Sequence, residues 1–308
     1  MINRIIIRIK VLQIVYAYYQ KNSMDLALAE NELMFSLKKS YDLYHYLILM
    51  ILLLTDAEQK RLDKMKNKLL ATESDLNPNR RLADNRFAAQ LNKNKQLQKF
   101  TNEKGTFWNN EDNHLVKLIL NEILESDIYS EYLKSKDVFE SDKRFWLNVF
   151  KKIILNQSEI SEILEGQSIY WNDDLDVIGS FVLKTLRGIK QDTPPEQGLY
   201  PMFKDEKDKE FAFQLLHHAL LEGKENTKRI TNQINNWETE RLAIIDLYII
   251  QIALSEIRNF PTIPINVSLN EYIELSRYYS TPKSPIFVNG ILDAIVKELK
   301  SENLLFKD

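Results

Sequence analysis

Residues that form tight turns are scarce in this chain, which has only seven glycines and eight prolines among its 308 residues. A sheet of many strands needs a tight turn at most strand ends, and glycine and proline make such turns most readily. Long helices joined by short connections need far fewer of them. Apolar residues also recur at helical spacing along most of the chain, and no stretch alternates convincingly between apolar and polar residues. The sequence therefore predicts an all-α fold.

Capping signals indicate where several helices begin and end. Three helices are expected on such signals: 206–222 after Asp205, 269–279 in a capping box that starts at Ser268, and 285–300 with Pro285 in first position. Gly223 is expected to end the first of them. Other helical patterns cover 5–20, 23–54, 112–133, 142–165, 172–188 and about 238–258. Helices should therefore account for most of the chain.

The distribution of charge divides the chain into segments. Residues 58–104 contain twelve basic and six acidic residues, whereas 105–205 contain eleven basic and eighteen acidic residues. We interpret 58–205 as an insertion, made of a basic stem at 58–104 and an acidic helical module at 105–205. It separates N-terminal helices at 1–57 from a C-terminal helical bundle at 206–308. A basic stem is usually a solvated surface, although it can add non-specific attraction to nucleic acid.

Patterns typical of enzymes and of metal or cofactor sites are missing from this sequence. It has no cysteine, which excludes thiolate metal sites and cysteine nucleophiles and suits a reducing cytoplasm. Its four histidines have no metal-binding spacing, and it has no glycine-rich phosphate loop. The apolar run 43–54 is too short for a membrane span, which needs about 20 residues. We therefore expect no enzymatic activity, metal, cofactor or membrane.

The opening segment, MINRIIIRIKVLQIVYAYYQ, places three cations in an otherwise apolar helix. Arg4 and Arg8 share one face, because residues four apart are neighbours on a helix. They could extend from a buried helix to its hydrated end, or contact neighbouring phosphates of a nucleic acid. Lys10 lies about 160° around the helix from the arginine face, at 100° per residue, and so belongs to another surface. The pattern alone leaves both interpretations open.

The segment RIKVLQIVYAYYQ and three later motifs, at Gln251–Ile257, Ile263–Ser276 and Phe287–Asp293, carry a family resemblance. In this order they resemble the NusB family of bacterial transcription antitermination factors. The last of the motifs reads FVNGILD. The similarity covers about 1–55 and 206–300, whereas the segment 58–205 has no counterpart in the compact form of the family.

This resemblance implies a fold of two packed three-helix bundles and a role without catalysis. Members of the family pair with the ribosomal small-subunit protein that is also NusE, and the pair binds the boxA element of nascent RNA. It thereby helps to assemble an antitermination complex on RNA polymerase, especially on ribosomal RNA operons. The same is expected of this chain, in the cytoplasm.

The resemblance also implies site residues. The RNA-binding candidates are Arg4, Arg8, Lys10, Lys283 and Phe287. The candidates for contact with the ribosomal protein are Tyr16 and Asp246. Phe287 could stack on a base or fill the bundle interior, and Tyr16 could equally belong to the core.

Two other functions remain as alternatives. One is a helical protein–protein adaptor with weak or lost RNA binding, because isoleucines replace part of the arginine cluster that is usual in the family. The other is an RNA cytosine methyltransferase, since domains of this kind occur fused to such enzymes. The missing cysteine nucleophile and the missing glycine-rich cofactor loop argue against the methyltransferase.

Overall fold

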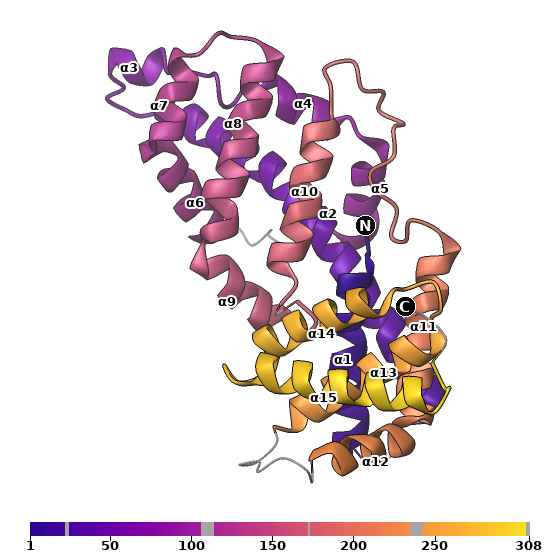
Figure 1. Ribbon diagram of the computed structural model, residues 1–308. Helices are drawn as coiled ribbons and strands as arrows, with labels where there is room; N and C mark the ends of the chain where they lie inside the picture. Colours follow the sequence, from indigo (N-terminus) through magenta and orange to yellow (C-terminus); the bar gives the residue numbers. More distant parts are fainter. Residues whose placement is uncertain (22–24, 106–113, 172, 235–242, 306–308) are drawn as a thin grey trace. The chain divides into compact units, whose positions relative to one another are not determined.

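The computed structural model of the protein describes residues 1–308 except 22–24, 106–113, 172, 235–242 and 306–308. The described residues form fifteen α-helices and one short 3-10 helix, and an isolated bridge between Ile2 and Phe203 is their only strand-like pairing (Figure 1). The all-α fold predicted from the sequence is therefore confirmed. The chain divides into two compact units, which are described separately.

The terminal unit consists of residues 2–37 and 203–308. Its helices are α1 (Arg4–Lys21), the first part of α2 (Leu26–Lys66), α11 (Glu206–Leu221), α12 (Gly223–Ile234), α13 (Ile244–Asn259), α14 (Ile265–Tyr279) and α15 (Ser284–Ser301). Helix α13 lies at the centre, because it contacts α1, α11, α12, α14 and α15 (Figure 1). Most of its residues are buried, which explains why its sequence is apolar on nearly every side.

The central unit consists of Met1 and residues 38–202. It contains the remainder of α2 and the helices α3 (Glu73–Leu76), α4 (Arg86–Asn92), α5 (Lys95–Lys104), α6 (His114–Glu125), α7 (Asp127–Lys134), α8 (Phe139–Lys152), α9 (Ser158–Gln167) and α10 (Leu175–Gly188), with a 3-10 turn at Ile154–Asn156. Helix α8 packs against α4, α7 and α10 and contributes the fully buried Trp146 and Phe150 to the core.

The basic stem and residues 105–202 of the acidic module belong to this same central unit. Asp137 binds Arg86 at 2.9 Å, and Glu196 binds Lys95 at 2.6 Å. Each of these ion pairs joins a cation of 58–104 to a carboxylate of 105–205. The two halves of opposite charge therefore partly neutralise each other, which reduces the net positive field that the stem could offer to a nucleic acid.

Helix α2 runs through the expected end of the N-terminal segment at residue 57. It has 41 residues and contains neither proline nor glycine, so nothing in its backbone chemistry ends it earlier. The chain passes from the terminal unit to the central unit between residues 37 and 38, inside this helix, and returns between residues 202 and 203.

The capping box expected at Ser268 does not form. Helix α14 begins three residues earlier, at Ile265 after Pro264, so Ser268 is already inside the helix. Its hydroxyl donates instead to the buried carboxylate of Glu256, at 2.7 Å. The buried carboxylate competes successfully for the hydroxyl, and the spacing of residues in the sequence does not reveal this partner.

Two of the other predicted helix starts are confirmed, and so is the predicted end of the helix before Gly223. The side chain of Asp205 accepts a hydrogen bond from the backbone of Asp208 and caps α11, and Pro285 lies in the first turn of α15. Helix α11 ends at Leu221 with Glu222 as its C-cap, and Gly223 directly after it also opens α12. A Cβ atom at this position would overlap the Tyr19 hydroxyl, so a close approach explains the glycine. The predicted helix over 238–258 falls partly on 235–242, outside the described residues.

Candidate nucleic-acid interface

The cation at position 8 lies inside the terminal unit. Helix α1 is buried on several sides, as its sequence predicts, and this places Arg8 against α13 and α14 with 3% of its surface exposed. Its Nε and Nη2 each donate to a carboxylate oxygen of Glu256 at 2.8 Å. Its Nη1 donates to Glu271 at 3.1 Å. The guanidinium thus ties three helices together.

The carboxylate of Glu256 has further partners. Ser268 donates to it at 2.7 Å and Tyr272 donates to it at 2.9 Å. Each oxygen of the buried carboxylate therefore accepts one hydrogen bond from Arg8 and one from a hydroxyl. Burial opposes the charged form of Arg8, but the hydrogen bond to Glu256 and the nearby negative charges outweigh it and raise the pKa of Arg8. Burial and the charge of Glu256 also raise the pKa of Tyr272 far above its ordinary value. Arg8 therefore stays charged and bound to Glu256.

These contacts bear on two of the expected RNA-binding residues. Arg8 is saturated by carboxylates, and Lys10 is fully buried. Neither cation is exposed to a ligand in this structure. The carboxylates that hold Arg8 follow it by 248 and 263 positions, so their pairing was not visible from the sequence.

Arg4 lies one turn before Arg8 and is accessible. Its side chain is 40% exposed and lies 3.7 Å from the carboxylate of Asp208 on α11. The guanidinium carbon is also 4.9 Å from the centre of the Phe211 ring, within the range of a cation–π contact. Arg4 therefore offers a positioned cation, although Asp208 partly neutralises it.

The connection between α14 and α15 offers the second accessible cation. Lys283 is exposed and makes no ion pair with any described residue. Tyr278, on the last turn of α14, has 79% of its surface exposed, and Ile286 on the first turn of α15 is exposed as well. Phe287 is only half-buried, so its ring is divided between the bundle and solvent. Exposed cations and exposed aromatic rings on one surface are typical of proteins that bind unpaired nucleotides.

Tyr278 was not among the residues chosen from the sequence. Its neighbour Tyr279 is also a tyrosine, and the helical pattern did not settle which of the two faces outward. The exposure of Tyr278 follows from the position of α14 against α13 and α15.

The two candidates for partner contact differ in accessibility. Tyr16 is 39% exposed, and its ring meets the edge of Tyr248 at 6.0 Å between centres. The ring of Tyr19 also stacks on the ring of Tyr248, with 5.2 Å between the ring centres. Asp246, in contrast, is 4% exposed and accepts a hydrogen bond from Ser284. Tyr16 can therefore meet a partner directly, whereas Asp246 is enclosed by its own chain.

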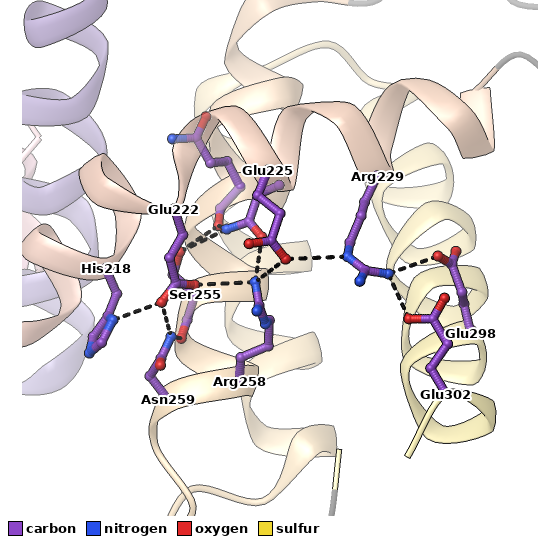
Figure 2. Close-up of polar contacts among 11 residues, drawn as sticks. His218, Glu222, Glu225, Arg229, Ser255, Arg258, Asn259, Glu298 and Glu302 are labelled. Atoms are coloured by element: carbon purple, nitrogen blue, oxygen red, sulfur yellow. Dashed lines mark hydrogen bonds and ion pairs between the residues drawn. The ribbon is translucent and has the colours of Figure 1, made fainter. Parts of the chain in front are cut away.

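Another surface of the terminal unit is acidic. Figure 2 shows a network on α12, α13 and α15 and at the C-terminal ends of α11 and α15, which contains four glutamates and two arginines, namely Glu222, Glu225, Glu298, Glu302, Arg229 and Arg258. Arg229 binds Glu298 at 2.9 Å and Glu302 at 3.0 Å, and Arg258 binds Glu225 at 3.2 Å. The network fastens these helices to one another. Its surplus of carboxylates makes it a poor surface for a polyanion such as RNA.

No described helix is both long enough and apolar enough to cross a membrane. No group of three or more His, Asp or Glu side chains among the residues that the structure describes is arranged to hold a metal ion.

The chain is similar in sequence to known proteins of one family. Residues 190–297 match the sequence model of the NusB family. Two similar proteins are both named transcription antitermination protein NusB. That of Salinibacter ruber is 36% identical over 132 residues, which are 41% of this chain and 82% of the relative. That of Geotalea daltonii is 33% identical over 134 residues, which are 43% of this chain and 89% of the relative.

A third protein of that name, from Chloroherpeton thalassium, is 41% identical over 103 residues. These residues are 33% of this chain and 49% of the relative, so the chain spans about half the length of that protein. No solved structure matches the chain. The family match falls almost entirely on the terminal unit, which carries Lys283 and Tyr278.

Proposed function

Because this chain belongs to the NusB family, we propose that it is a non-enzymatic transcription antitermination factor that binds RNA. In this proposal it pairs with the ribosomal small-subunit protein NusE and binds boxA-type nascent RNA. The pair then joins the antitermination complex on RNA polymerase in the cytoplasm, notably during transcription of ribosomal RNA. The shared name of the three relatives described above, transcription antitermination protein NusB, supports the general role.

One observation supports RNA binding by this chain in particular. The turn between α14 and α15 presents the unpaired cation of Lys283 close in sequence to the exposed ring of Tyr278. A lysine can contact a phosphate, and a tyrosine ring can stack on any unpaired base. Arg4 supplies a further exposed cation on the same unit. We assign the RNA contacts to these three residues and the partner contact to Tyr16.

The second candidate function, a helical adaptor with weak RNA binding, has its own support. Arg8 and Lys10 are buried, so only Arg4 remains accessible among the three cations of the opening helix that were expected to bind RNA. Fewer phosphate contacts mean weaker binding and a weaker dependence on salt. The basic stem compensates little in this view, because several of its cations are paired with carboxylates.

A binding titration separates the two functions. The purified chain is titrated with single-stranded boxA-type RNA, alone and with NusE, at several salt concentrations. If the main proposal holds, the logarithm of the binding constant falls with the logarithm of salt concentration, by about 0.7 per phosphate contact. Binding of NusE without measurable RNA binding supports the adaptor. Binding of neither NusE nor RNA contradicts both functions.

A further inference from the structure

The buried carboxylate of Asp246 is attached to the turn that carries Lys283. Asp246 lies in the first turn of α13, at the centre of the terminal unit, with 4% of its surface exposed. Its Oδ2 accepts a hydrogen bond from Oγ of Ser284, the first residue of α15, at 2.7 Å. The contact therefore joins the start of α15 to the first turn of α13.

Ser284 in turn closes the connection between α14 and α15. Its Oγ accepts a hydrogen bond from the backbone N–H of Thr281 at 3.1 Å. The same oxygen lies 2.9 Å from the Thr281 hydroxyl and 3.0 Å from the Ser280 hydroxyl. The Ser284 backbone donates to the Thr281 carbonyl at 2.9 Å. The Ser284 hydroxyl thus donates towards Asp246 and accepts from the Thr281 N–H, so this one side chain links α13 to the turn.

Lys283 lies inside this closed turn. It is the N-cap residue of α15, its carbonyl accepts a hydrogen bond from Phe287 at 3.3 Å, and its side chain caps nothing. The positive end of the helix dipole repels an ammonium group, which favours a Lys283 side chain directed to solvent. An anion bound there gains from both the lysine and the helix end. The position of this charge depends on the turn, and the turn depends on Ser284.

We propose that Asp246 is a positioning residue, which clamps residues 280–284 through Ser284 and thereby holds Lys283 in place for a phosphate of single-stranded RNA. This inference rests on the proposed function. It assigns Asp246 a role within the chain, because a residue so enclosed does not reach a partner protein or RNA itself. Partner contact then belongs to Tyr16, and RNA contact belongs to Lys283.

The test compares variants that break the clamp with one that preserves it. Asp246→Ala removes the acceptor, whereas Asp246→Asn keeps a side-chain oxygen that can accept from Ser284. The double variant Asp246→Ala/Ser284→Ala removes both buried polar partners, which avoids leaving one of them unpaired and favours a folded protein. Each variant is titrated with the RNA across salt concentrations and, separately, with NusE. Amide exchange at Thr281 and Ser284 reports on the turn without any ligand.

If the inference is right, Asp246→Ala and the double variant lose one phosphate contact. The salt slope then flattens by about 0.7, and affinity near physiological salt falls by about threefold to fivefold. Amide exchange in the turn accelerates, and adding Lys283→Ala causes no further loss, because that contact is already gone. Asp246→Asn keeps the wild-type slope, and affinity for NusE stays unchanged in every variant.

Several outcomes overturn this inference alone. They are a wild-type slope in the folded double variant, an equal loss in Asp246→Asn and Asp246→Ala, unchanged amide exchange, and a fall in NusE affinity that marks Asp246 as a partner contact. A different outcome, a wild-type chain that binds no RNA at any salt concentration, overturns the proposed function itself and removes the role of the clamp with it.

Discussion

Arg8 and Glu256 form a buried ion pair across 248 residues of sequence, with two hydrogen bonds of 2.8 Å between the guanidinium and the carboxylate. The pair joins the first helix of the chain to the central helix α13, and Glu271, Ser268 and Tyr272 complete it. It explains why an arginine stands in the apolar sequence of α1. Its role is to fasten the terminal unit.

The first prediction follows from this pair. Arg8→Ala leaves the Glu256 carboxylate buried without its cation, and breaking a buried ion pair in this way costs about 3–5 kcal/mol of stability. Unfolding in urea, followed by circular dichroism, measures the loss. Arg4→Ala is the matched control: its partly exposed pair with Asp208 contributes at most about 1 kcal/mol. Equal stability of the two variants would contradict a structural role for Arg8.

The same pair marks the limit of what the sequence could predict. Helical periodicity correctly predicted that α1 is buried on several sides, because that pattern lies within one helix. It could not pair Arg8 with Glu256, since such a pairing depends on how α1, α13 and α14 pack. The prediction for Ser268 was wrong for the same reason. Its local pattern predicted a capping box, but its hydroxyl donates to the buried carboxylate of Glu256 on a different helix.

The candidate site, like the fold, could be predicted from the sequence only in part. The family motifs pointed to the α14–α15 connection, and Lys283 within it is exposed. The sequence did not distinguish the exposed Tyr278 from its neighbour Tyr279, nor the accessible Arg4 from the enclosed Arg8. The exposure of each side chain depends on which helices pack around it. The spacing of residues along one helix does not carry this information.

The second prediction concerns the exposed cations. Replacing both Arg4 and Lys283 with alanine removes two phosphate contacts, so the salt slope of RNA binding should flatten by about 1.4, twice the value for one contact. The measurement is RNA affinity with NusE present at several salt concentrations. Lys21→Ala is the control, because Lys21 is an exposed cation at the far end of α1 and should leave the slope unchanged. A double variant with the wild-type slope would place the RNA on another surface.

The third prediction concerns the exposed ring of Tyr278. If an unpaired base stacks on it, Tyr278→Ala should weaken RNA binding by about 1–3 kcal/mol, whereas Tyr278→Phe keeps the ring and most of the affinity. The salt slope should stay constant in both variants, because stacking releases no counterions. Fluorescence anisotropy of labelled RNA gives both quantities. An alanine variant with wild-type affinity would remove Tyr278 from the interface.

The fourth prediction concerns the partner surface at Tyr16. Its ring is accessible beside Tyr248, so Tyr16→Asp should weaken the complex with NusE by a few kcal/mol, about the effect of losing an aromatic anchor. Tyr16→Phe keeps the ring and serves as the control. Calorimetry measures the affinity, and circular dichroism verifies that both variants fold. If Tyr16→Asp binds NusE as tightly as the wild type, the partner surface lies elsewhere.

The fifth prediction concerns the pH dependence of the central unit and arises from His45. This residue is buried on α2, with Nδ1 2.9 Å from the Tyr41 carbonyl and Nε2 3.1 Å from the Gln96 amide nitrogen. The carbonyl requires a proton on Nδ1, which the neutral and the charged ring can both carry, whereas the amide donor requires a bare Nε2, which only the neutral ring has. Burial lowers the pKa of His45 below its ordinary value, against the opposing effects of the Tyr41 carbonyl and the Asp42 charge.

A lowered pKa means that the unfolded chain binds this proton more readily than the folded chain. The stability is therefore full above the ordinary histidine pKa of about 6.5 and falls as the pH drops from there towards the lower pKa of the folded state. Between pH 7.5 and 5.5 the wild type should lose up to about 1.4 kcal/mol more than His45→Gln, which cannot take up the proton. Urea unfolding followed by the fluorescence of buried Trp146 measures the difference in the central unit. If the two proteins lose the same stability as the pH falls, His45 has the same proton affinity in the folded and unfolded chains, and the prediction is wrong.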